Sequence, residues 1–310
     1  MKILFLGTGD FSRPSLESLL ESAHEVIGVV TQPDRPKGRG QKLSPSPVKS
    51  LAIAKAVPVF QPERMRDHSS FELLKSLHPD LMVVVAYGQI LSPAVLAIPP
   101  HGCVNVHASL LPKFRGAAPI ARAILEGETR TGVTTMLIDA GMDTGPVLLT
   151  AQTDVEESDT LGTLHDRLAR LGAYLLMQTL EGLEKGTLTA LPQDPSLATY
   201  APKIQREEGR INWQTPARQL CNLLRAFDPW PGAFTVWAAR ILKLFQPRLL
   251  ETEAREAPGT VVETSAAGLR IATSQGDLLI RELQLENRPR MSVNEFLRGY
   301  PLNPGVQLGA

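Results

Sequence analysis

The sequence predicts an α/β protein with two domains, in which a mostly parallel sheet flanked by helices precedes a small antiparallel β-barrel. Three observations predict this architecture. The chain has 310 residues, which is more than one typical domain requires. Apolar, strand-like runs alternate with segments of helical periodicity in the first half. Short strand-like segments separated by turn residues follow residue 230.

The strands of the first domain are recognisable as uninterrupted apolar runs, because strands of a parallel sheet are buried on both faces. Leucines at helical spacing follow the first run and indicate a helix between strands. The expected strands are residues 3–6, 26–30, 81–86, 104–107 and 132–138. Strands that alternate with helices predict a Rossmann-like, mostly parallel sheet with helices on both faces.

A long amphipathic helix and a linker end the first domain. Ser158-Asp159-Thr160 can cap a helix whose leucines recur on one face to Leu175, so the helix is expected to end near Glu184. The segment 191–202 is rich in proline and breaks the pattern. The expected division is a catalytic domain over 1–189, a linker over 190–206 and a C-terminal domain over 207–310.

The C-terminal domain is predicted to be an OB-like β-barrel preceded by a short helix over residues 218–226. Several short strands joined by turns are typical of small closed sheets. The expected strands are residues 233–237, 241–245, 259–263, 269–273 and 278–285.

Composition narrows the class of protein. Hydrophobic residues make up 43% and charged residues 21% of the chain, as in ordinary globular proteins. The formal net charge is zero, so a nucleic-acid partner must be argued from local patches. Cys103 and Cys221 belong to no CxxC pair, which favours a reducing compartment. No signal peptide or stretch of roughly 20 apolar residues is evident, and a cytoplasmic protein is expected.

The glycine pair Gly7-Thr8-Gly9 after the first strand raises the possibility of a dinucleotide site. The G-x-G-x-x-G fingerprint requires a third glycine where Ser12 stands, and no acidic residue ends the second strand. We therefore favour a tight turn that lets the next helix pack closely, and disfavour a nicotinamide dehydrogenase.

The most informative residues are Asn105, His107 and Asp143. Asn105 and His107 lie two apart on a strand, so their side chains point to the same face. Both can donate hydrogen bonds to an oxygen that gains negative charge. Asp143 lies in a glycine-rich loop after a later strand, and this loop is expected at the same edge of the sheet as His107. An amide, an imidazole and a carboxylate could then meet in one cleft, although a core histidine and a turn-forming aspartate remain open interpretations.

Two other chemistries use the same residues. His101, Cys103 and His107 share strand parity and could bind zinc, but no fourth ligand is evident. Ser109 with His107 and Asp143 contains the groups of a hydrolase triad, but there is no G-x-S-x-G elbow. Both interpretations are weaker than the site formed by Asn105, His107 and Asp143.

The stretch Asn105-x-His107-x-Ser109-Leu110-Leu111-Pro112, together with Asp143-Thr144-Gly145, resembles the 10-formyltetrahydrofolate-dependent formyltransferases. The resemblance implies that Asn105, His107 and Asp143 are catalytic. It also implies that Ser109, Leu110, Leu111 and Pro112 contact the folate. Gly9 and Ala108 stand where proline and glycine are common in that family, and neither change removes a chemical group.

Residues 31–40, 44–49 and 226–232 are similar to the branch of this family that formylates a tRNA. The resemblance implies transfer of formyl from 10-formyltetrahydrofolate to the α-amino group of initiator methionyl-tRNA for translation initiation, without a metal. It also implies that the loop arginine Arg39 engages the tRNA acceptor end. Basic residues of this loop are the expected tRNA contacts, namely Arg35, Lys37, Arg39 and Lys42. A monomer that contacts no membrane is expected.

The net charge of the C-terminal domain is relevant to the proposed RNA partner. From Ala201 onward there are 14 basic and 11 acidic residues, a net charge of +3, and an OB-like barrel is a common nucleic-acid platform. Two alternatives remain open. One is a formyltransferase with an amino sugar, a nucleotide intermediate or water as acceptor, and the other is a non-catalytic RNA-binding protein built on a nucleotide-binding scaffold. The basic loop over residues 31–49 also has a simpler interpretation, as a solvated loop with no partner.

Overall fold

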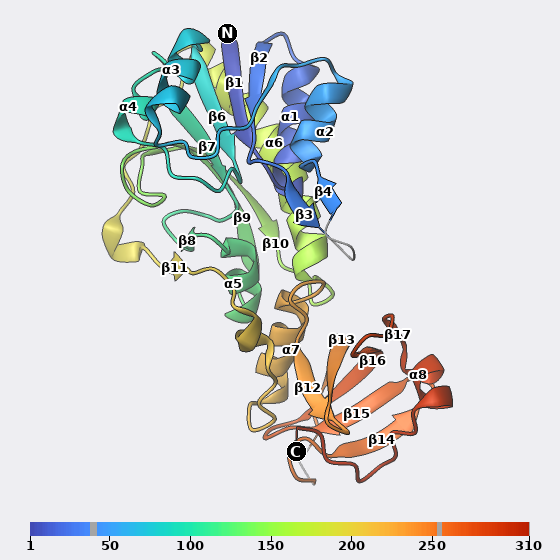
Figure 1. Cartoon of the computed structure of the whole chain (residues 1–310). Helices are drawn as coiled ribbons and strands as arrows, with labels where there is room; N and C mark the ends of the chain where they lie inside the picture. The colour runs from blue at the N-terminus through green and yellow to red at the C-terminus, as the bar shows by residue number, and fades with distance from the viewer. Residues whose placement is uncertain (38–41, 253–255, 310) are drawn as a thin grey trace. The chain divides into compact units, whose positions relative to one another are not determined.

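The computed structural model describes residues 1–37, 42–252 and 256–309, and the chain forms two compact units, each with its own sheet (Figure 1). The N-terminal unit comprises Met1–Pro119, Arg130–Asp154 and His165–Ala201. The C-terminal unit comprises Ile120–Thr129, Val155–Leu164 and Pro202–Ala310. Among the described helices, none has the length and hydrophobicity that crossing a bilayer requires.

The N-terminal unit is built on a seven-stranded sheet in the order β10-β9-β7-β6-β1-β2-β5. The strands β7, β6, β1, β2 and β5 are parallel to one another, whereas β9 and β10 are antiparallel to their neighbours. The predicted mostly parallel sheet is therefore confirmed. The elements in chain order are β1 (Lys2–Gly7), α1 (Arg13–Leu20), β2 (Glu25–Val30), β3 (Arg35–Lys37), β4 (Lys42–Ser44), α2 (Pro47–Ala54), β5 (Val59–Phe60), α3 (His68–Ser76), β6 (Leu81–Val85), α4 (Pro93–Leu96), β7 (Cys103–His107), β8 (Arg115–Gly116), α5 (Pro119–Leu125), β9 (Arg130–Leu137), β10 (Val147–Asp154), α6 (Leu161–Glu184) and β11 (Tyr200–Ala201).

The long helix α6 determines which face of β7 is left for chemistry. A Cβ on Gly172 of α6 would lie 2.9 Å from Cγ1 of Val106, so the helix packs directly on that residue. The hydroxyl of Thr179 in α6 also lies 2.7 Å from that of Thr135, the residue paired with Val106. Because side chains alternate along a strand, Asn105 and His107 project from the face opposite α6.

The direction of β9 corrects one expectation. We expected the loop after residues 132–138 to lie at the same sheet edge as His107, because it follows a strand. Asp143 of this loop does lie beside His107, but the end of the strand does not, because β9 runs antiparallel to β7 and pairs Leu137 with Val104 rather than with His107. The end of β9 therefore lies beside the beginning of β7. The loop 138–146 must fold back along the sheet to reach His107, and it then enters β10.

The structure of the turn after β1 is consistent with the predicted close packing of the helix that follows it. A Cβ on Gly7 would lie 2.9 Å from Cβ of Ser12, whereas a Cβ on Gly9 would meet no atom within 4 Å among the described residues. Gly7 therefore permits the close approach of the turn that leads into α1. Gly9 carries no such steric requirement.

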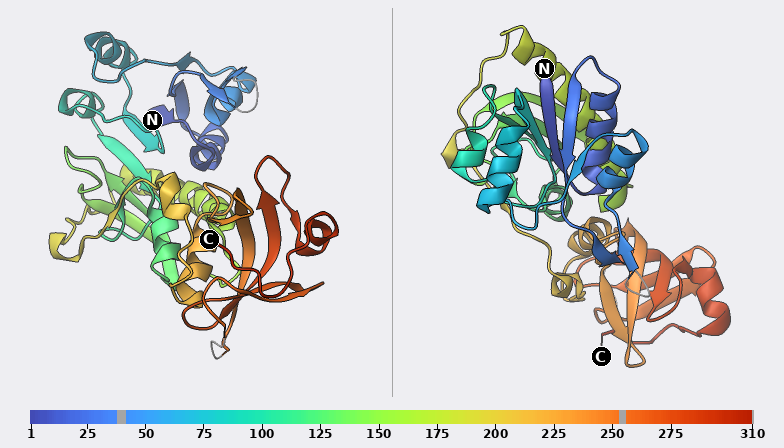
Figure 2. Two further views of the ribbon diagram at one scale, coloured as in Figure 1. Left: turned by 60° about the horizontal axis from the view of Figure 1, so that its bottom comes forward. Right: turned by 45° about the horizontal axis from the view of Figure 1, so that its top comes forward.

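The C-terminal unit has an antiparallel sheet in the order β12-β13-β16-β15-β14, with β17 paired to β16. Its strands are the orange to red arrows in both views of Figure 2. The predicted antiparallel C-terminal domain is confirmed. Its elements are α7 (Ala217–Ala226), β12 (Phe234–Trp237), β13 (Arg240–Leu250), β14 (Val261–Ser265), β15 (Gly268–Ala272), β16 (Asp277–Leu285), β17 (Met291–Ser292) and α8 (Val293–Gly299).

The final residues of the chain link the two edge strands of this sheet. Val261 of β14 donates from its N–H to the carbonyl of Val306 at 2.9 Å, and Gly309 donates to Val236 of β12 at 2.9 Å. The edge strands are thus joined through the tail rather than to each other. Apolar side chains of the strands and of α7 and α8 fill the core inside.

Candidate active site

His107 ends β7 and is 6% exposed. Its Nε2 lies 3.0 Å from the carbonyl oxygen of Phe114. A carbonyl can only accept a hydrogen bond, so Nε2 carries a proton and donates it. The other ring nitrogen, Nδ1, lies 3.7 Å from Oδ2 of Asp143. A proton on Nδ1 would therefore point towards a carboxylate.

Asp143 is held close to His107 by the backbone of the neighbouring loop. Its Oδ2 accepts a hydrogen bond of 2.8 Å from the N–H of Gly116. The side chain keeps 20% of its surface exposed, and its Oδ1 receives no hydrogen bond from the residues that the structure describes. One oxygen is thus anchored and the other is available to a substrate.

Asn105 lies two residues before His107 on the same face of β7 and is half-buried. Within the described ranges, no residue forms a hydrogen bond with its side-chain amide. The amide of Asn105 can therefore both donate and accept hydrogen bonds on the face of β7 that carries His107. His107 and Asp143 are therefore brought together, and Asn105 shares the face of β7 from which His107 projects.

Hydrogen bonds made by Gln193 stabilise the backbone conformation of the loop that carries Asp143. Asp143 has a φ of 54°, in the left-handed region that few residues other than glycine adopt. The side-chain Nε2 of Gln193 donates to the carbonyl of Asp143 at 2.9 Å and to that of Gly145 at 2.7 Å. The Oε1 of Gln193 accepts from Nε and Nη2 of Arg115 at 3.1 and 2.7 Å. Arg115 is 4% exposed, so this amide oxygen stabilises a buried cation.

The segment Ser109–Pro112 turns the chain directly after β7. The hydroxyl of Ser109 donates to the carbonyl of Lys113 at 2.6 Å, so it is not paired with His107 as a hydrolase triad requires. Thr134 donates from its hydroxyl to the carbonyl of Ser109 at 2.7 Å and accepts from the N–H of Leu111 at 3.1 Å. Leu110 and Pro112 are half-buried beside this turn. The turn is thus tied to β9 and has a fixed position next to the trio.

The residues considered for zinc do not assemble. Within the described part of the chain, His101, Cys103 and His107 form no group that could hold a metal ion. Burial raises the pKa of the Cys103 thiol to about 12, which disfavours the thiolate that metal binding requires.

The basic loop of the N-terminal unit forms a short hairpin, in which β3 pairs with β4. Arg35 is exposed, and its guanidinium lies 3.4 Å from Oε1 of Gln32. Lys37 of β3 and Lys42 of β4 are partners in the backbone register of this pair. Arg39, the predicted contact for the tRNA end, lies outside the described residues.

The base of this hairpin is tied down by three side chains. Lys49 donates from Nζ to Asp34 Oδ2 at 2.6 Å and to Gln61 Oε1 at 2.7 Å, and Gln61 donates back to Asp34 at 2.9 Å. The hydrogen bond from Lys49 lowers the pKa of the Asp34 carboxyl. The one acidic residue of the loop is therefore neutralised at its base, and the remaining charge of the hairpin is positive.

Comparison with known proteins decides the family. Residues 1–180 match the sequence model described as "Formyl transferase", and residues 203–301 match "Formyl transferase, C-terminal domain". The chain belongs to the formyl transferase family. The predicted resemblance is confirmed, and both matched regions contain the elements described above.

Relatives of similar length share about half of the sequence. A "Methionyl-tRNA formyltransferase" of Pelobacter propionicus is 50% identical over 99% of this chain and 96% of its own length. Another of that description, from Alkaliphilus oremlandii, is 45% identical over the full length of both chains. Similarity therefore extends over both units.

Solved structures share the fold at lower identity. The sugar 3N-formyl transferase WlaRD superposes with a TM-score of 0.69 at 19% identity, covering 93% of this chain and 99% of that chain. HypX from Aquifex aeolicus in complex with tetrahydrofolic acid superposes with a TM-score of 0.66 at 19% identity, covering 100% of this chain and 50% of that chain.

Gly145 of this formyl transferase has a steric role that a substitution tests. A Cβ at this position would lie 1.8 Å from the carbonyl oxygen of Leu137, so Gly145→Ala must displace the loop that carries Asp143. We expect a loss of stability of about 1–3 kcal/mol and a large loss of activity. Denaturant unfolding and turnover measure these effects. Gly9→Ala, at a position with open space, is the matched control and should leave both unchanged.

Gln193 and Arg115 were not among the candidate site residues predicted from the sequence. Gln193 lies between two prolines in the segment expected to be a linker, and glutamine there carries no motif. Arg115 lies three residues after Pro112, outside the stretch that carries the resemblance. Residues 190–201 belong to the N-terminal unit, where Leu191 pairs with Val147 and β11 pairs with β8. No local pattern in the sequence signals these contacts.

Proposed function

We propose that this chain transfers the formyl group of 10-formyltetrahydrofolate to the α-amino group of initiator methionyl-tRNA, giving N-formylmethionyl-tRNA and tetrahydrofolate. The main support is the 45–50% identity over nearly the whole chain to methionyl-tRNA formyltransferases. The contact of His107 with Asp143 and the shared face of Asn105 and His107 on β7 support the proposed chemistry. In this proposal the protein acts in the cytoplasm, where charged initiator tRNA is used.

The reaction proceeds through a tetrahedral intermediate. The neutral amine attacks the formyl carbon, and the carbonyl oxygen gains negative charge. The Asn105 amide and a proton on Nδ1 of His107 donate hydrogen bonds to this oxyanion. The C–N10 bond then breaks, and N10 takes up the proton that Asp143 accepted from the amine, directly or through water, so that tetrahydrofolate leaves. No covalent bond to the protein is needed.

Asp143 accepts the proton that the attacking amine loses in this mechanism. Its Oδ2 is held by Gly116, so Oδ1 is the oxygen that accepts the proton, directly or through water. The demand on this base is modest, because a free α-amine has a pKa of about 7.7–8.0 and is partly neutral near pH 7. The same carboxylate balances the positive charge of His107 when both ring nitrogens carry protons.

The folate is proposed to lie against the turn Ser109–Pro112. Ser109 uses its hydroxyl within the turn, so its contribution is to hold the backbone in place. The half-buried side chains of Leu110 and Pro112 offer apolar surface to a flat ring. We propose a mechanism that uses folate as a co-substrate and no metal.

The decisive experiment is incubation with 10-formyltetrahydrofolate and methionyl-tRNA, followed by detection of formylmethionine after mild hydrolysis. The control acceptors are free methionine, uncharged tRNA and an amino sugar nucleotide. Formylation only of the charged tRNA is expected. Equal activity on the amino sugar nucleotide would show that the acceptor has been assigned wrongly.

The two domains are proposed to divide the labour, with residues 1–189 carrying the chemistry and residues 207–310 binding tRNA. The basic residues Arg35, Lys37, Arg39 and Lys42 of the loop 31–49 are proposed to contact the tRNA acceptor end. Their positive charge would make binding weaken as salt rises.

Arg39→Ala tests the role of the hairpin. We expect the KM for methionyl-tRNA to rise about 10-fold, because a guanidinium–phosphate contact is worth about 1–3 kcal/mol in charge-assisted hydrogen bonding. The affinity for the folate should remain within about two-fold of wild type. Steady-state kinetics with each substrate varied in turn gives both values. An equal loss for both substrates would contradict this division.

A further inference from the structure

Two backbone groups of one short segment determine how His107 and Asp143 face each other. The carbonyl oxygen of Phe114 lies 3.0 Å from Nε2 of His107. The N–H of Gly116 donates to Oδ2 of Asp143 at 2.8 Å. Phe114 directly precedes β8, and Gly116 ends it. The imidazole and the carboxylate are thus both held by the chain between residues 114 and 116, and a displacement of this segment changes both side chains together.

The backbone of this segment has a conformation that few residues adopt. Phe114 has a φ of 59°, in the left-handed region that is unusual for a bulky side chain. Such a conformation persists only where the surrounding structure enforces it, and it occurs most often at functional sites. The contacts that keep Phe114 in this conformation therefore identify residues that position the site.

Thr199 makes these contacts. Its hydroxyl accepts a hydrogen bond of 2.8 Å from the N–H of Phe114. Its carbonyl accepts from the N–H of Arg115 at 2.9 Å, and its own N–H donates to the carbonyl of Pro112 at 3.4 Å. Phe114 is 4% exposed, whereas Thr199 is exposed. Three hydrogen bonds from one surface residue therefore hold the backbone on both sides of Phe114.

The two residues after Thr199 continue this contact as β11, which pairs with β8 in parallel register. A Cβ on Gly116 would lie 2.9 Å from the carbonyl oxygen of Ala201, so the two strands approach closely. This pairing uses backbone groups, whereas the N–H of Phe114 is held by the hydroxyl of Thr199. A substitution at Thr199 can therefore release Phe114 without breaking the strand pair.

We propose that Thr199 is a positioning residue for formyl transfer, which acts on His107 through the carbonyl of Phe114. This role rests on the proposed function. The carbonyl accepts the proton of Nε2, so it fixes the orientation of the ring and the nitrogen that carries the proton in the neutral state. Nδ1 is then the nitrogen that faces Asp143 and the reacting oxygen. Without this acceptor the ring keeps only its contact of 3.7 Å with Asp143, and both tautomers become accessible.

The test compares the full-length variants Thr199→Val and Thr199→Ser with wild type. Valine keeps the branched shape but cannot accept from the N–H of Phe114, whereas serine keeps the hydroxyl. Because Thr199 is exposed, neither change opens a cavity in the core, and thermal unfolding should remain close to wild type. We expect kcat for methionyl-tRNA to fall about 10-fold in Thr199→Val, with both KM values within about two-fold of wild type. Thr199→Ser should recover most of the lost kcat.

The ring nitrogens of His107 give a second readout that needs no substrate. The nitrogen NMR spectrum of isotopically labelled protein distinguishes protonated from unprotonated ring nitrogens, and His107→Ala identifies the signals of this residue. For the neutral ring of wild type and of Thr199→Ser, Nε2 should appear protonated and Nδ1 unprotonated. In Thr199→Val both signals should move towards the averaged positions of a tautomer mixture.

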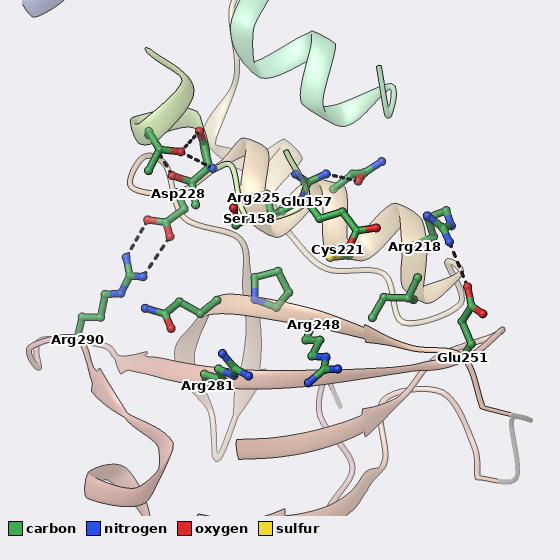
Figure 3. Close-up of a pocket in the computed structure, with 16 residues that line it drawn as sticks. Glu157, Ser158, Arg218, Cys221, Arg225, Asp228, Arg248, Glu251, Arg281 and Arg290 are labelled. Carbon is green, nitrogen blue, oxygen red and sulfur yellow. Dashed lines mark hydrogen bonds and ion pairs between the residues drawn. The ribbon is translucent and has the colours of Figure 1, made fainter. Parts of the chain in front are cut away.

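Two controls test whether the effect is specific. Thr187 is an exposed threonine of the same unit, and its hydroxyl donates to the carbonyl of Gly182 at 3.3 Å. Glu251 and Arg218 form an exposed ion pair of 3.3 Å at a polar cavity of the C-terminal unit (Figure 3). Thr187→Val and Glu251→Gln each remove one polar contact at the surface, and both should keep the wild-type kcat and His107 signals.

Wild-type kcat in Thr199→Val would overturn the proposal. A lower kcat with unchanged His107 signals would also overturn it, because Thr199 would then act by another route. The same holds for a loss that Thr199→Ser does not recover, or for an equal loss in either control. If the wild-type protein formylates no methionyl-tRNA, the proposed function fails, and the His107 signals of Thr199→Val still decide whether Thr199 positions the ring.

Discussion

Substituting Asn105 with alanine is expected to lower the turnover of formyl transfer by about 10²–10³-fold, because loss of one donor to an oxyanion costs that much in comparable sites. The Asn105 amide has no hydrogen-bond partner among the described residues, so the variant should keep its fold and its stability. A loss of turnover without a loss of stability is the signature of a group that acts on the substrate. Single-turnover kinetics and thermal unfolding measure the two quantities.

His107→Ala and Asp143→Asn should show losses of similar size. The three effects are expected to be far from additive, because the trio stabilises one intermediate. His165→Ala is a suitable control. The ring of His165 packs against Phe11 with a centroid distance of 5.4 Å and belongs to the surface of α6. Near-wild-type turnover in all three trio variants would end the assignment of this site.

Gln193→Leu is expected to lower both stability and turnover. It removes the donor to the carbonyls of Asp143 and Gly145 and leaves the buried guanidinium of Arg115 without its acceptor. A hydrogen bond to a charged group contributes about 1.5–3 kcal/mol, so a loss of stability in this range is expected. Displacement of Asp143 by about 1 Å can cost roughly 10²-fold in rate.

Gln193→Glu separates these two effects. A carboxylate retains an oxygen that can accept from Arg115, but it cannot donate to the carbonyls of Asp143 and Gly145. Stability should therefore remain close to wild type while kcat falls and the KM values change little. Chemical denaturation and steady-state kinetics give the comparison. Wild-type kcat in Gln193→Glu would show that Gln193 stabilises Arg115 only and does not position Asp143.

Strand parity explains how far the sequence could predict the site. Asn105 and His107 had to share a face because a strand has a period of two, whatever the rest of the chain does. The apolar runs at β1, β6 and β7 indicated buried strands, because only a covered sheet tolerates such runs. These inferences depend on local spacing, and local spacing is visible in a sequence.

The approach of Asp143 to His107 depends on contacts between distant segments. The direction of β9 was not readable from its residues, since parallel and antiparallel strands use the same amino acids. The expected route of the loop was therefore wrong, even though Asp143 does lie beside His107. The left-handed backbone at Asp143 persists because Gln193, 50 residues later, donates to its carbonyl.

The sequence by itself determined the buried strands, the shared face of Asn105 and His107 and the family of the chain, because periodicity and motif spacing are local properties. Only the tertiary structure decided which oxygen of Asp143 is free and which residues hold its loop. Each of these depends on hydrogen bonds and ion pairs between residues far apart in the chain, and such pairings form only when the backbone has brought the groups within about 3 Å of each other.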